Sequence, residues 1–161
     1  MSDEIVVRQA VAEDGPELMR LAIDATQENA FVEPDMLLLA ETIHAAATTN
    51  MGLAGVIGGA PGERLEGMII LRIGNPWYSQ DRILDEKAIY VAPEFRSAKG
   101  GRARKLAEWA KYTSEKLGIP LAIGVLSNSR TEAKIRLYER VFGAPAGVYV
   151  LYNANTGLDK G

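Results

Sequence analysis

The stretch from Ala88 to Leu106 constrains the fold of this chain more than any other. It opens with the apolar run 88–91, whose β-branched and aromatic residues favour a strand. Pro93 has no N–H to donate to a sheet ladder, so we expect the strand to end there. A basic turn that contains glycine follows, and apolar residues then recur at helical spacing up to Leu117. The sequence therefore predicts a strand, a glycine turn and a helix in direct succession.

This order has a chemical consequence at the start of the predicted helix. The first amides of a helix lack partners inside the helix, and the helix dipole adds partial positive charge there. Together with the flexible backbone of Gly100 and Gly101, these amides suit a phosphate or pyrophosphate group. The same glycines also fit a plain strand-to-helix turn in which they only permit tight packing. A P-loop is excluded, because no Lys-Ser or Lys-Thr pair follows them.

The residues around the turn form a longer pattern. It reads Val91-x-Pro93-x-Phe95-Arg96, then Gly100-Gly101-Arg102-Ala103, then Leu106. This pattern resembles the acetyl-CoA-binding motif of the GNAT superfamily of N-acyltransferases, where a strand ending in V-x-P-x-[YF]-R leads through an R/Q-x-x-G-x-G/A loop into a helix. Counting back from Gly101 puts Ala98 at the first loop position, whereas counting from Pro93 puts Arg96 there. One additional residue in the loop reconciles the two alignments.

The resemblance implies a fold and a cofactor. The fold is α/β, with a mixed and mostly antiparallel central sheet, helices on both faces, and a splayed pair of parallel strands that binds acyl-CoA. The loop amides would bind the pyrophosphate of coenzyme A, and the pantetheine arm would insert between the splayed strands and bond to their main chain. The residues that the resemblance assigns to acetyl-CoA are Tyr90, Val91, Ala92, Arg96, Ala98, Lys99, Gly100, Gly101, Arg102, Ala103 and Asn128.

A second segment of the superfamily, N-x-x-A-x-x-x-Y-x-x-x-G-F, has a counterpart near the C-terminus. Asn128 and Tyr138 match its asparagine and tyrosine, but their spacing is longer than usual and Phe142-Gly143 reverses the Gly-Phe pair. Tyr138 is then the candidate acid that protonates the leaving thiolate. Glu86, ahead of the predicted central strand, is the candidate base, although a carboxylate in such a place is also typical of a solvated surface.

These residues predict an enzyme that transfers an acyl group, foremost acetyl, from coenzyme A to a small-molecule or protein amine. Transfer is expected to be direct, because the chain has no cysteine to form an acyl-enzyme. One alternative is a domain that binds acyl-CoA without catalysing transfer and acts as a sensor or a structural partner. Another is a small nucleic-acid-binding protein that uses a basic run, although a run of this kind is usually a solvated face. The run consists of Arg96, Lys99, Arg102, Arg104 and Lys105.

Composition limits the classes of function further. A chain of 161 residues is long enough to bury a core, and we expect one domain over residues 1–161. The net charge of −3 argues against a general nucleic-acid-binding protein. The absence of cysteine excludes disulfides, thiol catalysis and cysteine-bound zinc, and with one histidine no metal site is expected. Without a membrane-span-length apolar stretch or a signal-peptide pattern, we expect a cytoplasmic protein that does not associate with membranes. A homodimer is left open.

The rest of the chain supplies the expected framework. Asp14 looks like a helix cap with Glu17 able to reach back to it, and Gly118 looks like the stop of the central helix. Trp77 either shapes the acceptor pocket or caps the core. His44 is expected to have no role, because the motif places the thioester away from its helix. The predicted strands are residues 5–7, 51–57, 66–73, 88–91, 120–126 and 147–153, and the predicted helices begin near residues 14, 34, 102 and 131.

Overall fold

The computed structural model describes residues 4–28, 31–96, 101–125, 131–147 and 152. Its strands form a five-stranded sheet in the order β1-β2-β3-β4-β5. Neighbours from β1 to β4 are antiparallel, and β4 and β5 are parallel. The strands are β1 (Arg8–Gln9), β2 (Gly52–Gly58), β3 (Leu65–Gly74), β4 (Ile83–Val91) and β5 (Leu121–Ala122). The predicted α/β fold with a mixed, mostly antiparallel sheet is confirmed.

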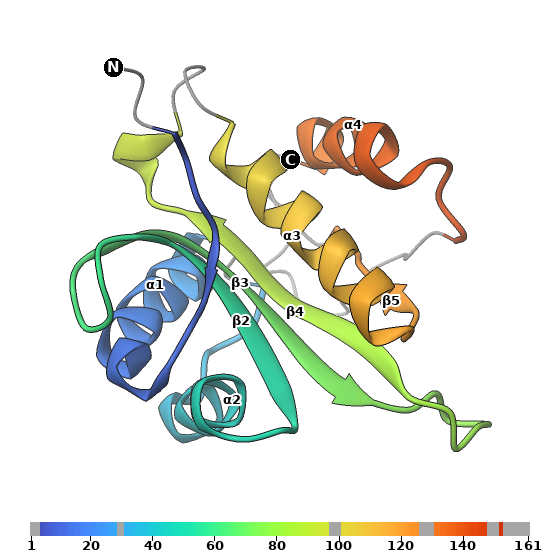
Figure 1. Ribbon diagram of the computed structural model, residues 1–161, viewed down its shortest axis with the longest axis horizontal. Coiled ribbons are helices and arrows are strands. Elements are labelled where there is room, and N and C mark those ends of the chain that lie inside the picture. Colours follow the sequence, from blue (N-terminus) through green and yellow to red (C-terminus); the bar gives the residue numbers. More distant parts are fainter. Residues whose placement is uncertain (1–3, 29–30, 97–100, 126–130, 148–151, 153–161) are drawn as a thin grey trace.

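Helices cover both faces of this sheet (Figure 1). One face carries α1 (Gly15–Glu28) and α2 (Met36–Thr48), and the other carries α3 (Arg102–Leu117), with α4 (Thr131–Phe142) packed beside α3. The short 3-10 helices are η1 (Ala12–Asp14) and η2 (Pro93–Phe95). Gly118 ends α3 in the left-handed conformation at φ 66°, as its place in the sequence predicts. No helix in the described ranges is long and apolar enough to cross a membrane.

The core has two layers because successive side chains of a strand point to opposite faces of the sheet. Tyr90 and Ala92 pack in the layer under α1 and α2, whereas Leu84 and Val91 pack in the layer under α3. Even-numbered side chains thus change face along β4. The change occurs at Lys87, where the register against β3 shifts so that Lys87 has no partner on that strand.

Asp14 does not cap α1 as predicted. Its carboxylate is fully buried and makes a bidentate ion pair with Arg8, with N–O distances of 2.7 and 2.8 Å. It also accepts the amides of Val11 at 2.9 Å and Gly62 at 3.2 Å, so it joins β1, η1 and the turn between β2 and β3. Glu17 does not reach back to Asp14 but accepts Arg20 at 2.8 Å on its own helix.

The strand predictions hold best in the middle of the sheet. The first strand lies at Arg8–Gln9 rather than at residues 5–7, and β5 covers only Leu121–Ala122 of the predicted 120–126. The predicted last strand, 147–153, falls mostly outside the described residues. Within the described ranges, no group of three or more His, Cys, Asp or Glu side chains is placed to hold a metal ion.

Candidate active site

The parallel strands β4 and β5 pair over a short distance and then separate. The paired residues are Leu84 with Leu121 and Asp85 with Ala122, and the Leu84 amide donates to the Pro120 carbonyl at 2.8 Å. Beyond Asp85, no pair with β5 is found in the described part of the chain. The rest of β4 therefore has an open edge toward α3 and α4.

Hydrogen bonding in the β3–β4 ladder decides which backbone groups face this open edge. The Ala92 amide donates to the Glu66 carbonyl on the β3 side at 2.9 Å. Main-chain groups alternate in direction along a strand, so those of Tyr90 also face β3, whereas those of Val91 and Ile89 face the open edge. Of the three residues predicted to bond the pantetheine arm, only Val91 has its amide there. The Ala92 amide is thus used in the ladder with β3, and the geometry points to Ile89 beside Val91 for the pantetheine arm; which residues bind that arm stays a prediction.

A pocket of about 160 Å³ lies along this edge. Residues from four parts of the chain line it: the end of α1, the second half of β4 with η2, the start of α3, and the inner side of α4. They are Glu28, Ile89, Tyr90, Val91, Phe95, Arg96, Gly101, Arg102, Ala103, Ala133, Lys134, Leu137 and Tyr138. The structure thus brings Tyr138 together with most of the described residues that the sequence assigns to the cofactor.

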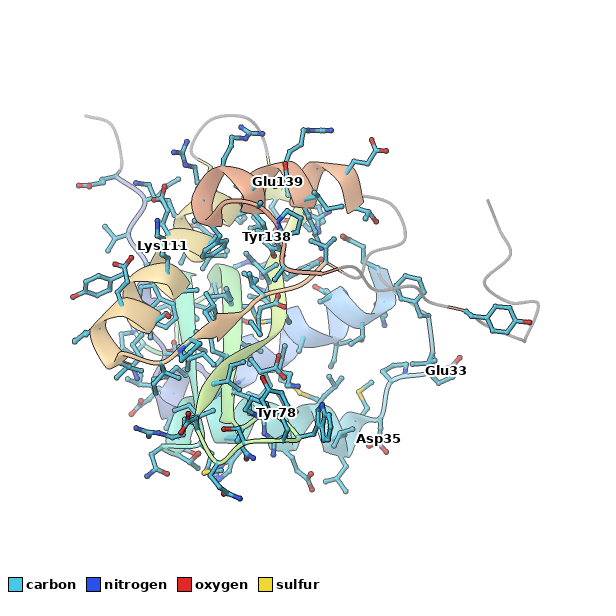
Figure 2. The ribbon with its side chains drawn as sticks, turned by 90° about the vertical axis from the view of Figure 1, so that its right-hand side faces the viewer. Glu33, Asp35, Tyr78, Lys111, Tyr138 and Glu139 are labelled. Carbon is cyan, nitrogen blue, oxygen red and sulfur yellow. The ribbon has the colours of Figure 1, made fainter. Side chains whose placement is uncertain are left out.

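Tyr138 projects from α4 toward the sheet, and the next residue, Glu139, is exposed (Figure 2). The tyrosine side chain is 8% exposed, and its hydroxyl is buried without a hydrogen-bond partner among the described residues. Burial raises the pKa of the Tyr138 phenol, and the charge of Glu86 raises it further. The phenol is therefore protonated at neutral pH and has a hydrogen bond left to donate.

Glu86 lies inside β4, one residue before the bulge at Lys87, and not ahead of the strand as predicted. Its side chain is half-buried and shares the face of Leu84, which is the face of α3 and α4. Burial raises the pKa of the Glu86 carboxyl to about 7, against the opposing effects of the Lys134 ammonium and a hydrogen bond from the Gly124 backbone. This burial distinguishes Glu86 from a fully solvated surface carboxylate, and its role as a base stays a prediction.

The start of α3 lies at the other end of the pocket. Gly101 precedes the helix in the left-handed conformation, with φ 58° and ψ 49°. The Lys105 amide donates to the Gly101 carbonyl at 3.0 Å, so the amides of Arg102, Ala103 and Arg104 precede the first bond of the helix. These amides and the positive end of the helix dipole suit an anionic group at the pocket.

The arginines assigned to the cofactor lie at this end of the pocket, but both are bonded to carboxylates. Arg96 pairs with Glu28 at 2.6 Å, and Arg102 pairs with Glu66 at 2.7 Å. Arg104, from the basic run, pairs with Glu108 at 2.9 Å. The remaining predicted residues, Ala98, Lys99, Gly100 and Asn128, lie outside the described residues.

No protein-family model matches the sequence, and a search of curated proteins finds no match. Solved structures do match. A possible acetyltransferase from Clostridium difficile 630 is 19% identical over 95% of this chain and 98% of its own, with a TM-score of 0.66. The ribosomal-protein-alanine N-acetyltransferase of Brucella melitensis biovar Abortus 2308 is 17% identical over 94% and 99%, with a TM-score of 0.63. The aminoglycoside N-acetyltransferase AAC(6')-Iy in complex with CoA is 12% identical over 95% and 96%, with a TM-score of 0.68.

The chain has the GNAT fold. At these identities the likeness extends to the fold alone, and the chemistry must be argued from this chain's own residues. Within the GNAT fold, the separation of β4 from β5 and the bulge at Lys87 confirm the predicted splayed strand pair.

Sequence reasoning missed several residues of this GNAT-fold pocket. Lys134 precedes Tyr138 by four residues, and residues at that spacing share one side of a helix. That spacing was a usable signal. Glu28 had no such signal, because 68 residues separate it from its partner Arg96.

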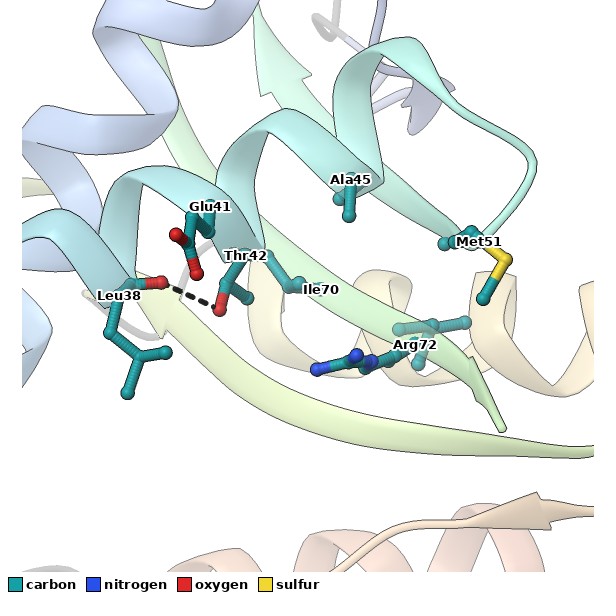
Figure 3. Close-up of a pocket in the computed structure, with 10 residues that line it drawn as sticks. Leu38, Glu41, Thr42, Ala45, Met51, Ile70 and Arg72 are labelled. Carbon is teal, nitrogen blue, oxygen red and sulfur yellow. Dashed lines mark hydrogen bonds between the residues drawn. The ribbon is translucent and has the colours of Figure 1, made fainter. Parts of the chain in front are cut away.

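A second, smaller pocket of about 90 Å³ lies on the opposite face of the sheet, between α2 and the strands β2 and β3 (Figure 3). Its rim includes Glu41, Arg72 and Thr42, whose hydroxyl donates to the Leu38 carbonyl at 3.0 Å. None of the predicted site residues lines it.

Outside both pockets, Trp77 is 96% exposed on the loop after β3, so it does not cap the core. Tyr78, beside it on the same loop, is labelled in Figure 2 and is 74% exposed. His44 is exposed on α2, and its ring contacts only the Thr48 hydroxyl among the described residues. That placement leaves the expectation that His44 has no role unchanged.

Proposed function

We propose that this protein is an N-acyltransferase that transfers an acetyl group from coenzyme A directly to an amine. The observation that carries the proposal is the open edge of β4, which meets an orphaned, protonated phenol at one side and an anion-binding helix start at one end. A core tyrosine usually finds a hydrogen-bond partner when it is buried, so an orphaned one facing a pocket indicates a ligand.

Coenzyme A fits these groups. The amides at the start of α3 suit its pyrophosphate, and the Val91 and Ile89 main chains suit the amides of its pantetheine arm. The bound thioester supplies the activated acyl group. The predicted residues Ala98, Lys99, Gly100 and Asn128 belong to this proposal from the sequence alone.

Three groups of the chain divide the chemistry between them. Glu86 takes the proton from the attacking amine, directly or through a water molecule. An outward amide of β4, from Val91 or Ile89, donates to the carbonyl oxygen as negative charge grows there. Tyr138 gives its proton to the departing sulfur as the carbon–sulfur bond breaks and the carbon–nitrogen bond forms. The proton on Glu86 and the one lost by Tyr138 are then exchanged with solvent.

The electrostatics support this division of roles. A pKa of about 7 lets the Glu86 carboxyl accept a proton near neutral pH without being strongly solvated. The raised pKa keeps the Tyr138 phenol protonated at neutral pH. The negative charge of Glu86 also raises the pKa of the phenol.

Two measurements test the proposal. CoA at a hundredfold excess over its dissociation constant should stabilise the fold by about 2.7 kcal/mol, which a thermal-shift assay detects. Acetyl-CoA with an amine should then release free thiol, and a thiol-reactive chromophore reports it without background because the chain has no cysteine. The amine panel starts with aminoglycosides and peptides that begin with alanine, after the names of two structural neighbours.

The outcomes separate the alternatives. Stabilisation by CoA together with thiol release supports the enzyme. Stabilisation without release on any amine favours a silent acyl-CoA-binding domain. No stabilisation at millimolar CoA overturns both.

A further inference from the structure

Arg96 and Arg102 were assigned to the cofactor from the sequence, but their bonds give them another task. The Arg96 guanidinium donates from Nη2 to Glu28 at 2.6 Å and from Nε to the Val91 carbonyl at 2.7 Å. Its Cζ lies 5.1 Å from the centre of the Tyr90 ring. It thus joins the end of α1 to the end of β4.

Arg102 repeats the arrangement on the other side of the turn. Its Nε donates to Glu66 on β3 at 2.7 Å, and its Nη1 to the Phe95 carbonyl at 3.4 Å. Its Cζ lies 5.0 Å from the centre of the Phe95 ring. It thus joins the first turn of α3 to β3 and η2.

Each arginine therefore has a carboxylate, a backbone carbonyl and an aromatic ring as partners. The side chains are only 21% and 18% exposed, so solvent screens these ion pairs less than it would on an open surface. The paired residues lie 68 and 36 positions apart in the sequence, so both pairs are tertiary contacts. Both arginines also line the proposed cofactor pocket.

We propose that Glu28 and Glu66 are positioning residues of the cofactor site. They hold the Arg96 and Arg102 side chains in place, and the bonds of these arginines fix the end of β4 and the start of α3 relative to each other. The phosphates are then bound by backbone amides at the start of α3 and not by these two guanidinium groups. This inference rests on the proposed function.

The sign of one charge effect makes the inference testable. Removing a carboxylate near an anionic cofactor should by itself tighten binding, because repulsion is lost. It should tighten binding further if the freed arginine were a phosphate ligand. Only a positioning role predicts weaker binding when the negative charge is removed.

The experiment compares Glu28→Gln and Glu66→Gln with a matched control, Glu94→Gln. Glu94 lies on η2 beside Arg96 and pairs with Arg64 at 3.6 Å, but both side chains are exposed, at 53% and 66%. Calorimetry would give the dissociation constant of CoA for each variant. We expect Glu28→Gln and Glu66→Gln to bind about fivefold to tenfold more weakly than wild type, the scale of one typical net hydrogen bond. The effect should be larger on the KM for acetyl-CoA than on kcat, because a positioning role acts on cofactor binding.

A second readout does not depend on the cofactor. In the free protein, hydrogen exchange of peptides covering η2 and the first turn of α3 should be faster in both variants than in Glu94→Gln. Binding by Glu28→Gln and Glu66→Gln as tight as or tighter than by Glu94→Gln would overturn the inference. If wild type binds no CoA, the proposed function fails and the cofactor role fails with it. Faster exchange in both variants would still support the structural effect of the two arginine–glutamate pairs.

Discussion

The backbone N–H of Gly124, just past the last paired residue of β5, lowers the pKa of the Glu86 carboxyl, against the larger opposite effect of burial. Glu86 lies on the face of the sheet that α3 and α4 cover, and its charge raises the pKa of the Tyr138 phenol.

Glu86→Gln should abolish the acidic limb of the pH–rate profile. In wild type, kcat/KM should fall tenfold per pH unit below about pH 7, because burial raises the pKa of the carboxyl to about 7 and protonation removes the base. The variant should be slower by about 10²-fold or more above that pH and lack this limb. Thiol-release assays from pH 5 to 9 on a verified acceptor give the pH–rate profiles of wild type and the variant.

Asp85→Asn is the matched control for this substitution. Asp85 is the neighbouring residue on the other face of β4, and its exposed side chain pairs with Lys87 at 2.7 Å. Loss of the acidic limb in this variant as well would mean that local charge, and not Glu86, causes it.

The contribution of Glu86 to folding stability should have the opposite pH dependence to its contribution to activity. The folded pKa lies above the ordinary value of 4.5, so the favourable contribution is complete below that pH and is lost as pH rises through about 7. Glu86→Gln should therefore unfold at a higher temperature than wild type at pH 8, with a smaller difference at pH 5. An equal or lower melting temperature at pH 8 would show that the carboxylate is not poorly solvated.

Asp14→Asn should destabilise the fold by about 3 kcal/mol, because it leaves the Arg8 guanidinium without its buried partner. Hydrogen bonding from Arg8 lowers the pKa of Asp14 from 3.8 to about 2. A lowered folded pKa gives stability that is present above pH 3.8 and is lost as pH falls toward 2, here about 2 kcal/mol. Urea unfolding at pH 7 and pH 3 should show roughly half of this loss, about 1 kcal/mol, because pH 3 lies midway between the two pKa values.

Asp24→Asn controls for the change of an aspartate on the same part of the chain. Asp24 is 44% exposed and lies 3.9 Å from its partner Arg20, so its loss should cost under about 1 kcal/mol at either pH. Equal effects of the two substitutions would contradict the importance of the buried pair.

The sequence predicts local geometry well and long-range partners poorly. Gly101 and Gly118 were found at the two ends of the central helix because a left-handed residue at a helix end is a local requirement. Asp14 was misread for the same reason. A capping pattern is visible in a few residues, whereas a buried ion pair with Arg8 depends on how β1 returns to η1.

The site residues follow the same rule. Tyr138 was found from a motif, and the structure places it in the pocket with a free phenol. The burial of Glu86 could not be predicted from the sequence, because the bulge at Lys87 changes which residues of β4 point toward α3 and α4. Arg96 and Arg102 are paired with carboxylates from other elements of the fold. The motif does not contain those partners, so from the motif alone both arginines are predicted to bind the cofactor.

Gly101→Asp should weaken CoA binding by about 10²-fold, because it puts a fixed negative charge where helix amides would face a pyrophosphate. The fold should survive. Among the described residues, a Cβ at this position meets only the Arg104 Cβ at 3.8 Å, which is ordinary contact, and the left-handed conformation costs an aspartate about 1 kcal/mol. Calorimetry with CoA and circular dichroism test the two halves of this prediction.

Gly118→Asp is the matched control. It introduces the same residue at a similar φ of 66°, at the opposite end of the same helix, where a Cβ meets nothing within 4 Å. Gly58 is unsuitable, because a Cβ there would lie 2.6 Å from the Arg64 carbonyl oxygen and disturb the hairpin. If both α3 variants lost CoA binding equally, strain in the helix, and not charge at the site, would be the cause.

Tyr138→Phe should lower turnover by about 10²-fold or more while changing KM for acetyl-CoA little, because it removes a proton donor needed only as sulfur leaves. The ring remains, so its edge contact with Phe142, at 6.1 Å between centroids, is kept. Steady-state kinetics on a verified acceptor separate kcat from KM.

Stability provides the opposing test for Tyr138. A structural tyrosine loses a hydrogen bond when it becomes phenylalanine and the fold is weakened. Here the hydroxyl is buried without a partner among the described residues, so its removal should raise stability, by about 1 kcal/mol. If Tyr138 is catalytic and its hydroxyl has no hydrogen-bond partner in the free protein, the variant should turn over more slowly than wild type and melt at a higher temperature. A variant with normal turnover and a lower melting temperature would mean that Tyr138 is structural and that water or another hydroxyl protonates the thiolate.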